Sequence, residues 1–211
     1  MNIKNSLKLL AFLLTIQITG QISHKDLENQ SKAAYYSYTN LDSLFKISRI
    51  LEKSSNSCIS YNGKTNIASA YYKSGKFKKS EEISLRVLFD LKGATTTCDL
   101  NNKFSSLTRL FWIKINERKF NKAIKYLNQR RELLENYSNR DDKYLTKKIA
   151  IKTSLALVKN SLGFHKEAIE LAKQAIIEYS QIKYEFSFIH NYPLKVNRAS
   201  AYNIIGDSYL G

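Results

Sequence analysis

The chain has 211 residues, with 34 Lys and Arg against 18 Asp and Glu, a net charge of +16, and only 1 Pro, 7 Gly and 2 Cys. This length allows one domain with a sizeable core or a short repeat array, and the hydrophobic fraction of 43% argues against a wholly disordered chain. The scarcity of Pro argues against all-β and loop-rich folds. Two cysteines are too few for a disulfide-dense mini-protein or a four-cysteine zinc site.

The start of the chain is typical of a secretory signal peptide, which we expect over residues 1–20. Lys4 and Lys8 precede an apolar run from Leu9 to Ile18, and a polar segment follows. A run of about ten residues is too short to span a membrane. We therefore expect export to the periplasm or the cell exterior, with cleavage after residue 20. The alternative is a buried N-terminal helix, which the absence of acidic residues before Asp26 disfavours.

The two cysteines become candidate disulfide partners if the chain is exported, because it then matures in an oxidising compartment. Cys58 and Cys98 lie in polar segments, near 54–63 and 93–104, that we expect to separate helices. Pairing would close a loop of about 40 residues and contribute roughly 3–4 kcal/mol in the chain-entropy model. Two unrelated thiols are the alternative.

The surplus of positive charge suggests a nucleic-acid partner, but its distribution does not support one. Only 8 of the 34 basic residues are Arg, and between Lys114 and Lys152 basic residues such as Arg130 and Lys147 alternate with acids, as on solvated helix faces. A phosphate-reading surface more often uses Arg forks or an aromatic–basic platform. We therefore expect no specific nucleic-acid partner, and a basic binder of anionic polymer remains an alternative.

Helical periodicity runs through nearly the whole chain from Asp26, and no segment alternates apolar and polar residues for long enough to predict a strand. The sequence therefore predicts an all-α fold. Over residues 24–60 we expect an imperfect helix pair. Its helices should cover 25–38 and 41–54, with Asp42 and Ser43 as N-terminal capping residues.

Three later stretches share a fixed inner spacing. Each combines an apolar helix, a tight turn and a second helix, and an interval of 12 residues joins Ala68 to Ser80, Phe111 to Ala123, and Ala156 to Ala168. Small residues at facing positions let two helices approach closely, and Ala175 extends the stripe begun by Ala168. We expect helix-pair repeats over about 61–98, 104–138 and 149–183, within a repetitive region that spans 61–211. A truncated copy should occupy 199–211, with Gly206 at the small position.

The turn inside each pair also has a recurring chemistry. Gly75 and Gly163 fall where the first helix must end in a left-handed conformation, and Asn116 is the residue that tolerates it in the middle copy. Two residues after each glycine stand Phe77 and His165, which we expect to pack at the turn.

This pattern resembles the tetratricopeptide repeat family. The likeness is carried by Ala68, Tyr71, Gly75, Phe77 and Ser80 in the first copy, by Leu155, Ala156, Gly163, Ala168 and Ala175 in the third, and by Ile205, Gly206 and Tyr209 in the last. It implies an α-α superhelix, a solenoid of antiparallel helix pairs, and covers roughly residues 40–211. The repeats are longer than the family's typical 34 residues or so and lack its closing Pro. The middle copy departs most, with bulky Phe111 at a small position and Lys114 at an aromatic one. An unrelated helical bundle is the alternative.

In that family, first-helix side chains line a groove that binds extended peptides, so the resemblance implies a non-catalytic scaffold with a protein or peptide ligand. The candidate groove residues are Asn66, Ser69, Tyr72, Lys73, Arg109, Trp112, Asn116, Thr153 and Asn160. The single Trp is either a hot spot beside Arg109 or a core residue that packs on Phe111. The family's carboxylate-gripping pattern is not supported, because mostly Thr and Ser occupy the required positions.

No catalytic, metal or cofactor motif accompanies the repeats. His24, His165 and His190 have no metal-ligand spacing, and the sequence holds no G-x-S-x-G, phosphate-binding Gly loop or C-x-x-C. We expect no enzyme activity and no cofactor.

The end of the chain suggests a wider context. A last helix from about Arg198 should expose Tyr202, Ile205 and Tyr209, whereas repeat arrays normally finish with a polar cap. We therefore expect a membrane-anchored continuation after Gly211, although no transmembrane helix is expected within this chain. Secreted arrays of this kind resemble the extracytoplasmic sensor regions of Bacteroidetes-type regulators, which implies the interaction part of a larger signalling or transcription-regulatory protein. A self-contained secreted scaffold for envelope assembly is the rival expectation.

Overall fold

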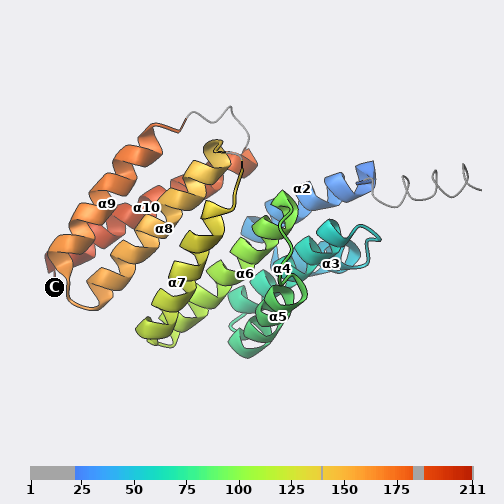
Figure 1. The fold of residues 1–211 in the computed structure, drawn as a ribbon, viewed down its shortest axis with the longest axis horizontal. Helices are drawn as coiled ribbons and strands as arrows, with labels where there is room; N and C mark the ends of the chain where they lie inside the picture. Colours follow the sequence, from blue (N-terminus) through green and yellow to red (C-terminus); the bar gives the residue numbers. More distant parts are fainter. Residues whose placement is uncertain (1–21, 139, 183–187, 211) are drawn as a thin grey trace, which may run out of the picture.

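The computed structural model describes residues 22–138, 140–182 and 188–210, and these residues form helices joined by short turns, with no strand among them (Figure 1). The helices in chain order are α2 (His24–Thr39), α3 (Leu41–Glu52), α4 (Ser57–Lys73), α5 (Phe77–Asp90), α6 (Thr97–Asn116), α7 (Phe120–Glu135), α8 (Asp142–Ser161), α9 (His165–Ser180) and α10 (Phe188–Leu210). The prediction of an all-α fold is confirmed for this part of the chain. The expected signal peptide, residues 1–20, lies outside the described residues.

The helices pack as hairpins that stack in chain order. Each of α2 with α3, α4 with α5, α6 with α7 and α8 with α9 forms a contacting pair, and each pair also contacts the next. Helix α10 packs on α8 and α9, as the first helix of a further pair would. The described residues therefore have the nearest-neighbour organisation of a helical-repeat array.

The turns inside three hairpins have the same geometry. Gly75, Arg118 and Gly163 have φ values of 75°, 54° and 82°, and each lies two residues beyond the end of its helix. In each turn the next residue's N–H donates to the carbonyl five residues earlier, at 2.8–2.9 Å, as in a Schellman motif. The prediction of Asn116 as the left-handed residue is wrong: Asn116 still belongs to α6, and the position is occupied by Arg118.

The residues joined by the 12-residue spacing face each other across their hairpins. Ser80 donates its hydroxyl to the carbonyl of Ala68 at 2.7 Å, and both residues are buried. The other two pairs lie in shared buried clusters: Phe111 with Ala123, and Ala156 with Ala168. A fully buried Ala175 packs with Ile149 and Tyr179, two turns beyond Ala168 along α9.

The middle hairpin accommodates its two unusual residues in different ways. Phe111 is fully buried and packs edge-on against Trp112, with ring centroids 5.3 Å apart. Lys114 is only 5% exposed and forms ion pairs with Glu81 at 2.7 Å and Glu117 at 2.9 Å. The lysine therefore keeps its charge inside the array because α5 and the α6–α7 turn supply carboxylates.

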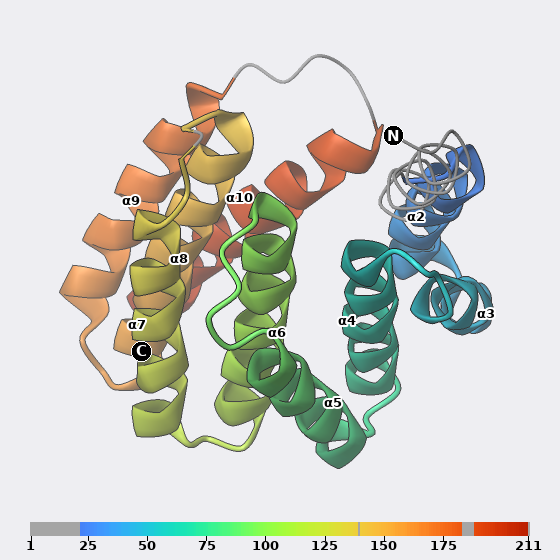
Figure 2. The ribbon, with the colours of Figure 1, turned by 45° about the vertical axis from the view of Figure 1, so that its right-hand side comes forward.

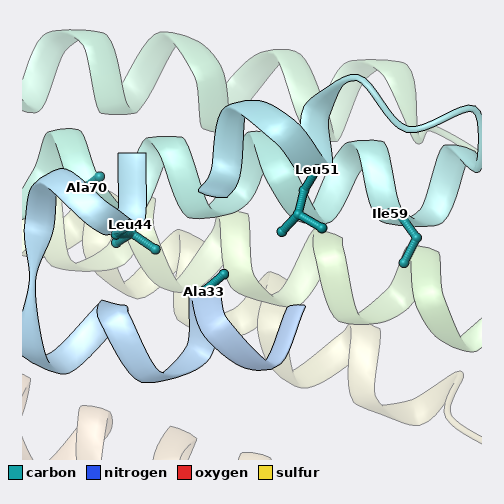
Figure 3. Packing of buried hydrophobic residues seen from close by; sticks show 5 residues of the cluster. All are labelled: Ala33, Leu44, Leu51, Ile59 and Ala70. Atoms are coloured by element: carbon teal, nitrogen blue, oxygen red, sulfur yellow. The ribbon is translucent and has the colours of Figure 1, made fainter. Parts of the chain in front are cut away.

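The first hairpin packs on α4 through a small apolar core. Ala33, Leu44, Leu51, Ile59 and Ala70 are all fully buried, and Figure 3 shows them spread along the packed helices α2, α3 and α4. At the rim of this core Tyr71 packs edge-on against Phe45, with ring centroids 5.0 Å apart. Apolar and aromatic residues therefore form the core of the contact between the N-terminal pair and the array, and the hydroxyl of Ser60 adds a hydrogen bond to the carbonyl of Glu52 at 2.8 Å.

The N-terminus of α3 is capped two to three residues earlier than the sequence suggested. Asn40 is the capping residue, and its side-chain oxygen accepts the backbone N–H of Ser43 at 2.9 Å. Asp42 and Ser43 lie inside the first turn, so their prediction as caps is wrong.

The cysteines lie within helices rather than in breaks between them. Asn56 and Thr96 cap α4 and α6, and Cys58 and Cys98 are the second residues of these two helices. A disulfide joins them, with their Cα atoms 5.8 Å apart. It fastens the N-terminal end of α4 to that of α6.

The small position expected in the last copy is not a packing position. Gly206 is exposed, and a Cβ built there would meet no atom within 4 Å. Instead Ala201, Ile204 and Ser208 form the buried face of α10, because they point toward α8 and α9. Tyr202 and Tyr209 are exposed and Ile205 is partly buried, so the expected exposed face of Tyr202, Ile205 and Tyr209 is only partly seen.

The last helix also reaches the first. Besides packing on α8 and α9, α10 contacts α2 (Figure 2), so the two ends of the described array touch. None of the described helices is both long enough and apolar enough to cross a membrane.

Candidate functional site: a cavity between α6, α8 and α10

A cavity of about 510 Å³ lies on the side of the array formed by α4, α6, α8 and α10, which we call the first-helix face. Side chains of α6, α8 and α10 line it, and Arg130 of α7 closes its floor. Along this face the backbone of α4 lies close to α6 and that of α8 close to α10, whereas the backbones of α6 and α8 stay further apart. The cavity occupies the gap that their separation leaves.

A stack of bulky buried side chains lies beside the cavity. Phe111, fully buried, stands where the other hairpins carry Ala68 and Ala156, and the side chain of Arg130 fills the space beside it. The guanidinium of Arg130 lies 5.7 Å from the ring centre of Phe111 and 4.8 Å from that of Phe104. Two members of this stack, Phe104 and Arg130, also line the cavity.

Arg130 carries a buried positive charge with no described carboxylate paired to it. Its side chain is only 2% exposed, one Nη donates to the hydroxyl of Ser154 at 3.2 Å, and its Nε has no hydrogen-bond acceptor among the described residues. None of the ion pairs formed by the described residues includes it. Burial lowers the pKa of Arg130 to about 10, so the group is still a cation at neutral pH.

Arg109 brings a second cation to the cavity from α6. It donates to the hydroxyl of Ser69 at 2.6 Å, and its guanidinium lies 4.6 Å from the ring centre of Tyr72. Its Nε is buried without an acceptor, and none of the described carboxylates forms an ion pair with it. Burial lowers the pKa of Arg109 to about 10, against the opposing influence of Tyr72 and Tyr38, so this group is also charged at neutral pH.

Lys147 and Asp207 complete the charged lining. The Lys147 ammonium lies 5.2 Å from the ring centre of Tyr137, and burial lowers its pKa while Asp141 acts in the opposite direction. Asp207 on α10 is exposed and is the only carboxylate among the described lining residues. The rest of the wall combines small hydroxyl side chains with the apolar residues Phe104, Trp112, Ala150, Leu157 and Ile204.

The structure gathers only part of the predicted groove at this cavity. Arg109, Trp112 and Thr153 line it directly. Ser69 and Tyr72 hold Arg109 from behind, and Asn116 donates to the Tyr72 hydroxyl at 2.9 Å. Trp112 is half-buried, packs on Phe111 and also lines the cavity, so the hot-spot interpretation stays a prediction.

The remaining candidates are engaged elsewhere. Asn66 bonds to Asn62 within α4, and Lys73 donates to the carbonyl of Ser37 in α2. Asn160 accepts from Ser208 at 2.8 Å and lies 2.7 Å from a ring nitrogen of His165, so it fastens α8 to α9 and α10. These three residues do not line the cavity and serve the packing of the array.

Sequence reasoning missed Arg130, which it assigned, like Lys114, to a solvated helix face; both assignments are wrong. A signal was available, because Ala123, Leu127, Arg130 and Leu134 follow the helical spacing of a single stripe, and all four are buried. A charged residue in a buried stripe needs a partner or a function.

The described residues hold no group of three or more His, Cys, Asp or Glu that fits a metal ion. Comparisons with protein-family models, with characterised proteins and with solved structures found no match for this chain.

Proposed function

We propose that this chain is a non-catalytic interaction scaffold that acts outside the cytoplasm and binds a protein or peptide ligand on its first-helix face. The observation that carries the proposal is the cavity between α6, α8 and α10, which combines the only Trp of the chain with Arg109 and Arg130. Cavities of about 300–1,000 Å³ with apolar walls and a few convergent polar groups are the usual form of a ligand site. Trp and Arg are also the side chains that most often dominate protein interfaces.

Trp112 supplies a direct test of this proposal. Because it is the only Trp and lines the cavity, its fluorescence reports occupation of the site. Titration of the purified chain with a peptide library should yield ligands that change this fluorescence saturably. Ala150→Phe, which fills the cavity from α8, should weaken those ligands at least about tenfold, a loss of about 1.4 kcal/mol. Lys125→Ala, at an exposed site on α7, is the matched control and should leave them unchanged. Peptides that bind Ala150→Phe as well as the parent chain would place binding elsewhere.

Export is supported by the N-terminal sequence pattern and by the Cys58–Cys98 disulfide, since disulfides persist mainly in oxidising compartments. We propose that residues 1–20 are removed during export. Mass spectrometry of chain recovered from a fractionated host should find a mature N-terminus near residue 21. Full-length chain retained in the cytoplasm would contradict export without bearing on the ligand site.

A further inference from the structure

We propose that the cavity between α6, α8 and α10 binds a small amphipathic organic anion, a carboxylate or phosphate monoester that carries an apolar body. This inference goes beyond the proposed scaffold function, because it gives the chain a small-molecule ligand whether or not a protein also binds. It rests on the charges, the walls and the burial of the cavity.

The cavity lining carries an excess of positive charge. Three cations, Arg109, Arg130 and Lys147, face one cavity, and the described lining offers a single carboxylate, Asp207. Leaving a buried guanidinium without an anion is costly, since each of these groups loses water on burial. Arg130 is only 2% exposed, and its Nε donor has no hydrogen-bond acceptor among the described residues. An anionic group in the cavity would neutralise this excess of positive charge.

The orientation of the two guanidinium groups is fixed before any ligand arrives. Phe104 and Ser154 hold Arg130, and Tyr72 and Ser69 hold Arg109. A planar guanidinium that is held in place loses little side-chain entropy when it binds a carboxylate or phosphate oxygen. These contacts therefore prepare the two arginines for an anion rather than satisfy them.

The walls define the rest of the ligand. Trp112, Leu157 and Ile204 enter the cavity from three different helices and present apolar surface. Inorganic phosphate or acetate would meet the cations but leave these walls unfilled. A ligand with an aromatic ring or a short aliphatic chain beside its anionic group fills both halves of a site of this volume.

The experiment uses the full chain, with Trp112 fluorescence and the melting temperature as readouts. The probes are 3-phenylpropionate, phenyl phosphate, hexanoate, the neutral 3-phenylpropionamide, acetate and inorganic phosphate. We expect saturable binding of at least one amphipathic anion with Kd below about 1 mM, and binding at least about tenfold weaker for the neutral amide, acetate and phosphate. The carboxylate and phosphate-ester arms identify which anionic group the site prefers.

Variants separate a site from general charge attraction. Arg109→Gln should weaken the amphipathic anion at least about tenfold, and Arg130→Gln at least as much. Arg130→Gln can destabilise the fold, because Arg130 is almost fully buried. The test therefore relies on Arg109→Gln, since Arg109 is only partly buried. Asp207→Asn should strengthen binding, since it removes a like charge from an exposed position on the wall. Lys122→Gln, at an exposed site on α7, removes one positive charge from the surface and should change nothing.

Three results would overturn the proposal. The first is that no amphipathic anion gives a saturable signal up to about 10 mM, an affinity too weak to matter at ordinary ligand concentrations. The second is equal binding of the anion and the neutral amide, and the third is binding that survives Arg109→Gln unchanged. Peptide binding in the preceding test together with a negative anion result would remove this inference alone. Anion binding without any peptide ligand would instead remove the protein-scaffold function alone.

Discussion

Gly63 is the residue at which two backbones approach most closely among the described glycines. A Cβ added there would lie 2.3 Å from the backbone nitrogen of Glu52 and 2.8 Å from its Cα, so α3 would have to move away from α4. We expect Gly63→Ala to destabilise the chain by about 1–3 kcal/mol, the usual cost of overpacking. Denaturant unfolding measures it.

Gly206→Ala is the matched control for this substitution. Its Cβ would meet no atom within 4 Å, and an exposed helix position gains up to about 1 kcal/mol when Ala replaces Gly. Replacement of Gly by Ala should therefore destabilise the chain at Gly63 and stabilise it at Gly206. A destabilising Gly206→Ala would restore the packing role that the sequence suggested for this residue.

Arg118 holds a conformation that suits glycine. Its φ of 54° matches the turns at Gly75 and Gly163, but its Cβ adds steric strain that a glycine avoids. We expect Arg118→Gly to stabilise the chain by about 1 kcal/mol, measured by thermal or denaturant unfolding. Lys119→Gly, one residue on and outside the left-handed region, is the control and should not stabilise it. Equal gains from both would mean that the turn is not strained.

Lys114 and Glu117 make part of the stability depend on pH. Hydrogen bonds from Lys114 and Lys119 lower the pKa of Glu117 below its ordinary value of 4.5. A lowered carboxyl pKa contributes stability that is present above the ordinary value and is lost as the pH falls through the folded-state value. We therefore expect Lys114→Met to lower the free energy of unfolding at pH 7 by about 1–3 kcal/mol and to flatten its decline between about pH 5 and 3.

The free energy of unfolding of the parent chain and of Lys114→Met, measured across this pH range, checks the prediction. Lys32→Met is the control, because Lys32 pairs with Glu28 on the surface, where both side chains are about half exposed. Exposed pairs contribute little, so this variant should keep the stability and the pH profile of the parent chain. An acid profile that Lys114→Met leaves unchanged would show that the ion pairs do not hold the middle hairpin.

At the scale of the elements, the spacing of apolar and small residues in the sequence predicted the helices and how they pair. Helices, hairpin turns and the facing residues Ala68 with Ser80 follow from positions three, four and twelve residues apart, which a sequence displays directly. Element starts were predicted less well, since Asn56 and Thr96 cap helices inside segments that look like polar breaks. Short polar side chains favour both loops and helix N-termini, so composition alone does not separate the two.

The cavity could not be predicted in the same way. It lies where the backbones of α6 and α8 stay apart, and that depends on how two successive hairpins pack on each other. The family resemblance placed Arg109 and Trp112 on one face of α6, and both line the cavity. It does not show that Lys147, on the next hairpin, and Asp207, on α10, face the same cavity.

The disulfide contributes at this scale as well, because it joins the beginnings of α4 and α6. It closes a loop over a sequence separation of 40 residues, and Asn102 donates to the carbonyl of Cys58 beside it at 3.3 Å. We expect replacement of both cysteines by Ser to lower the free energy of unfolding by about 4 kcal/mol, the chain-entropy value for such a loop.

Thiol counting and unfolding check this prediction together. Denatured, unreduced chain recovered after export should show no free thiol, and reduction should weaken the parent chain but not the double Ser variant. Two free thiols per chain in exported material would mean that the disulfide does not form.

At the scale of the whole molecule, the array consists of two blocks with a thin junction. One block is centred on α2, α3 and α4, and the other on α8, α9 and α10, each with its own buried cluster. The backbones of α6 and α8 stay apart, and the blocks are joined by the packing of α7 on α8, by the buried cluster of Phe111, Ala123, Leu127 and Val158, and by the contact of α10 with α2. In an array of nearest-neighbour contacts, a perturbation spreads only as far as its interfaces carry it.

Two reciprocal substitutions test how far stability is shared. Ala172 in α9 and Ala70 in α4 are both fully buried, each in one block's cluster. We expect Ala172→Leu to overpack its interface by about 1–3 kcal/mol and to accelerate amide hydrogen exchange across α8, α9 and α10. Ala70→Leu should do the same across α2, α3 and α4. In each variant the opposite block should keep its protection, because the junction at the cavity transmits little packing strain. Equal loss of protection in both blocks would show instead that the α2–α10 contact binds the ends into one cooperative unit. A ligand bound in the cavity would contact α6, α8 and α10 at once. The same amide-exchange measurement with an anion bound then shows whether the ligand couples the two blocks into one cooperative unit.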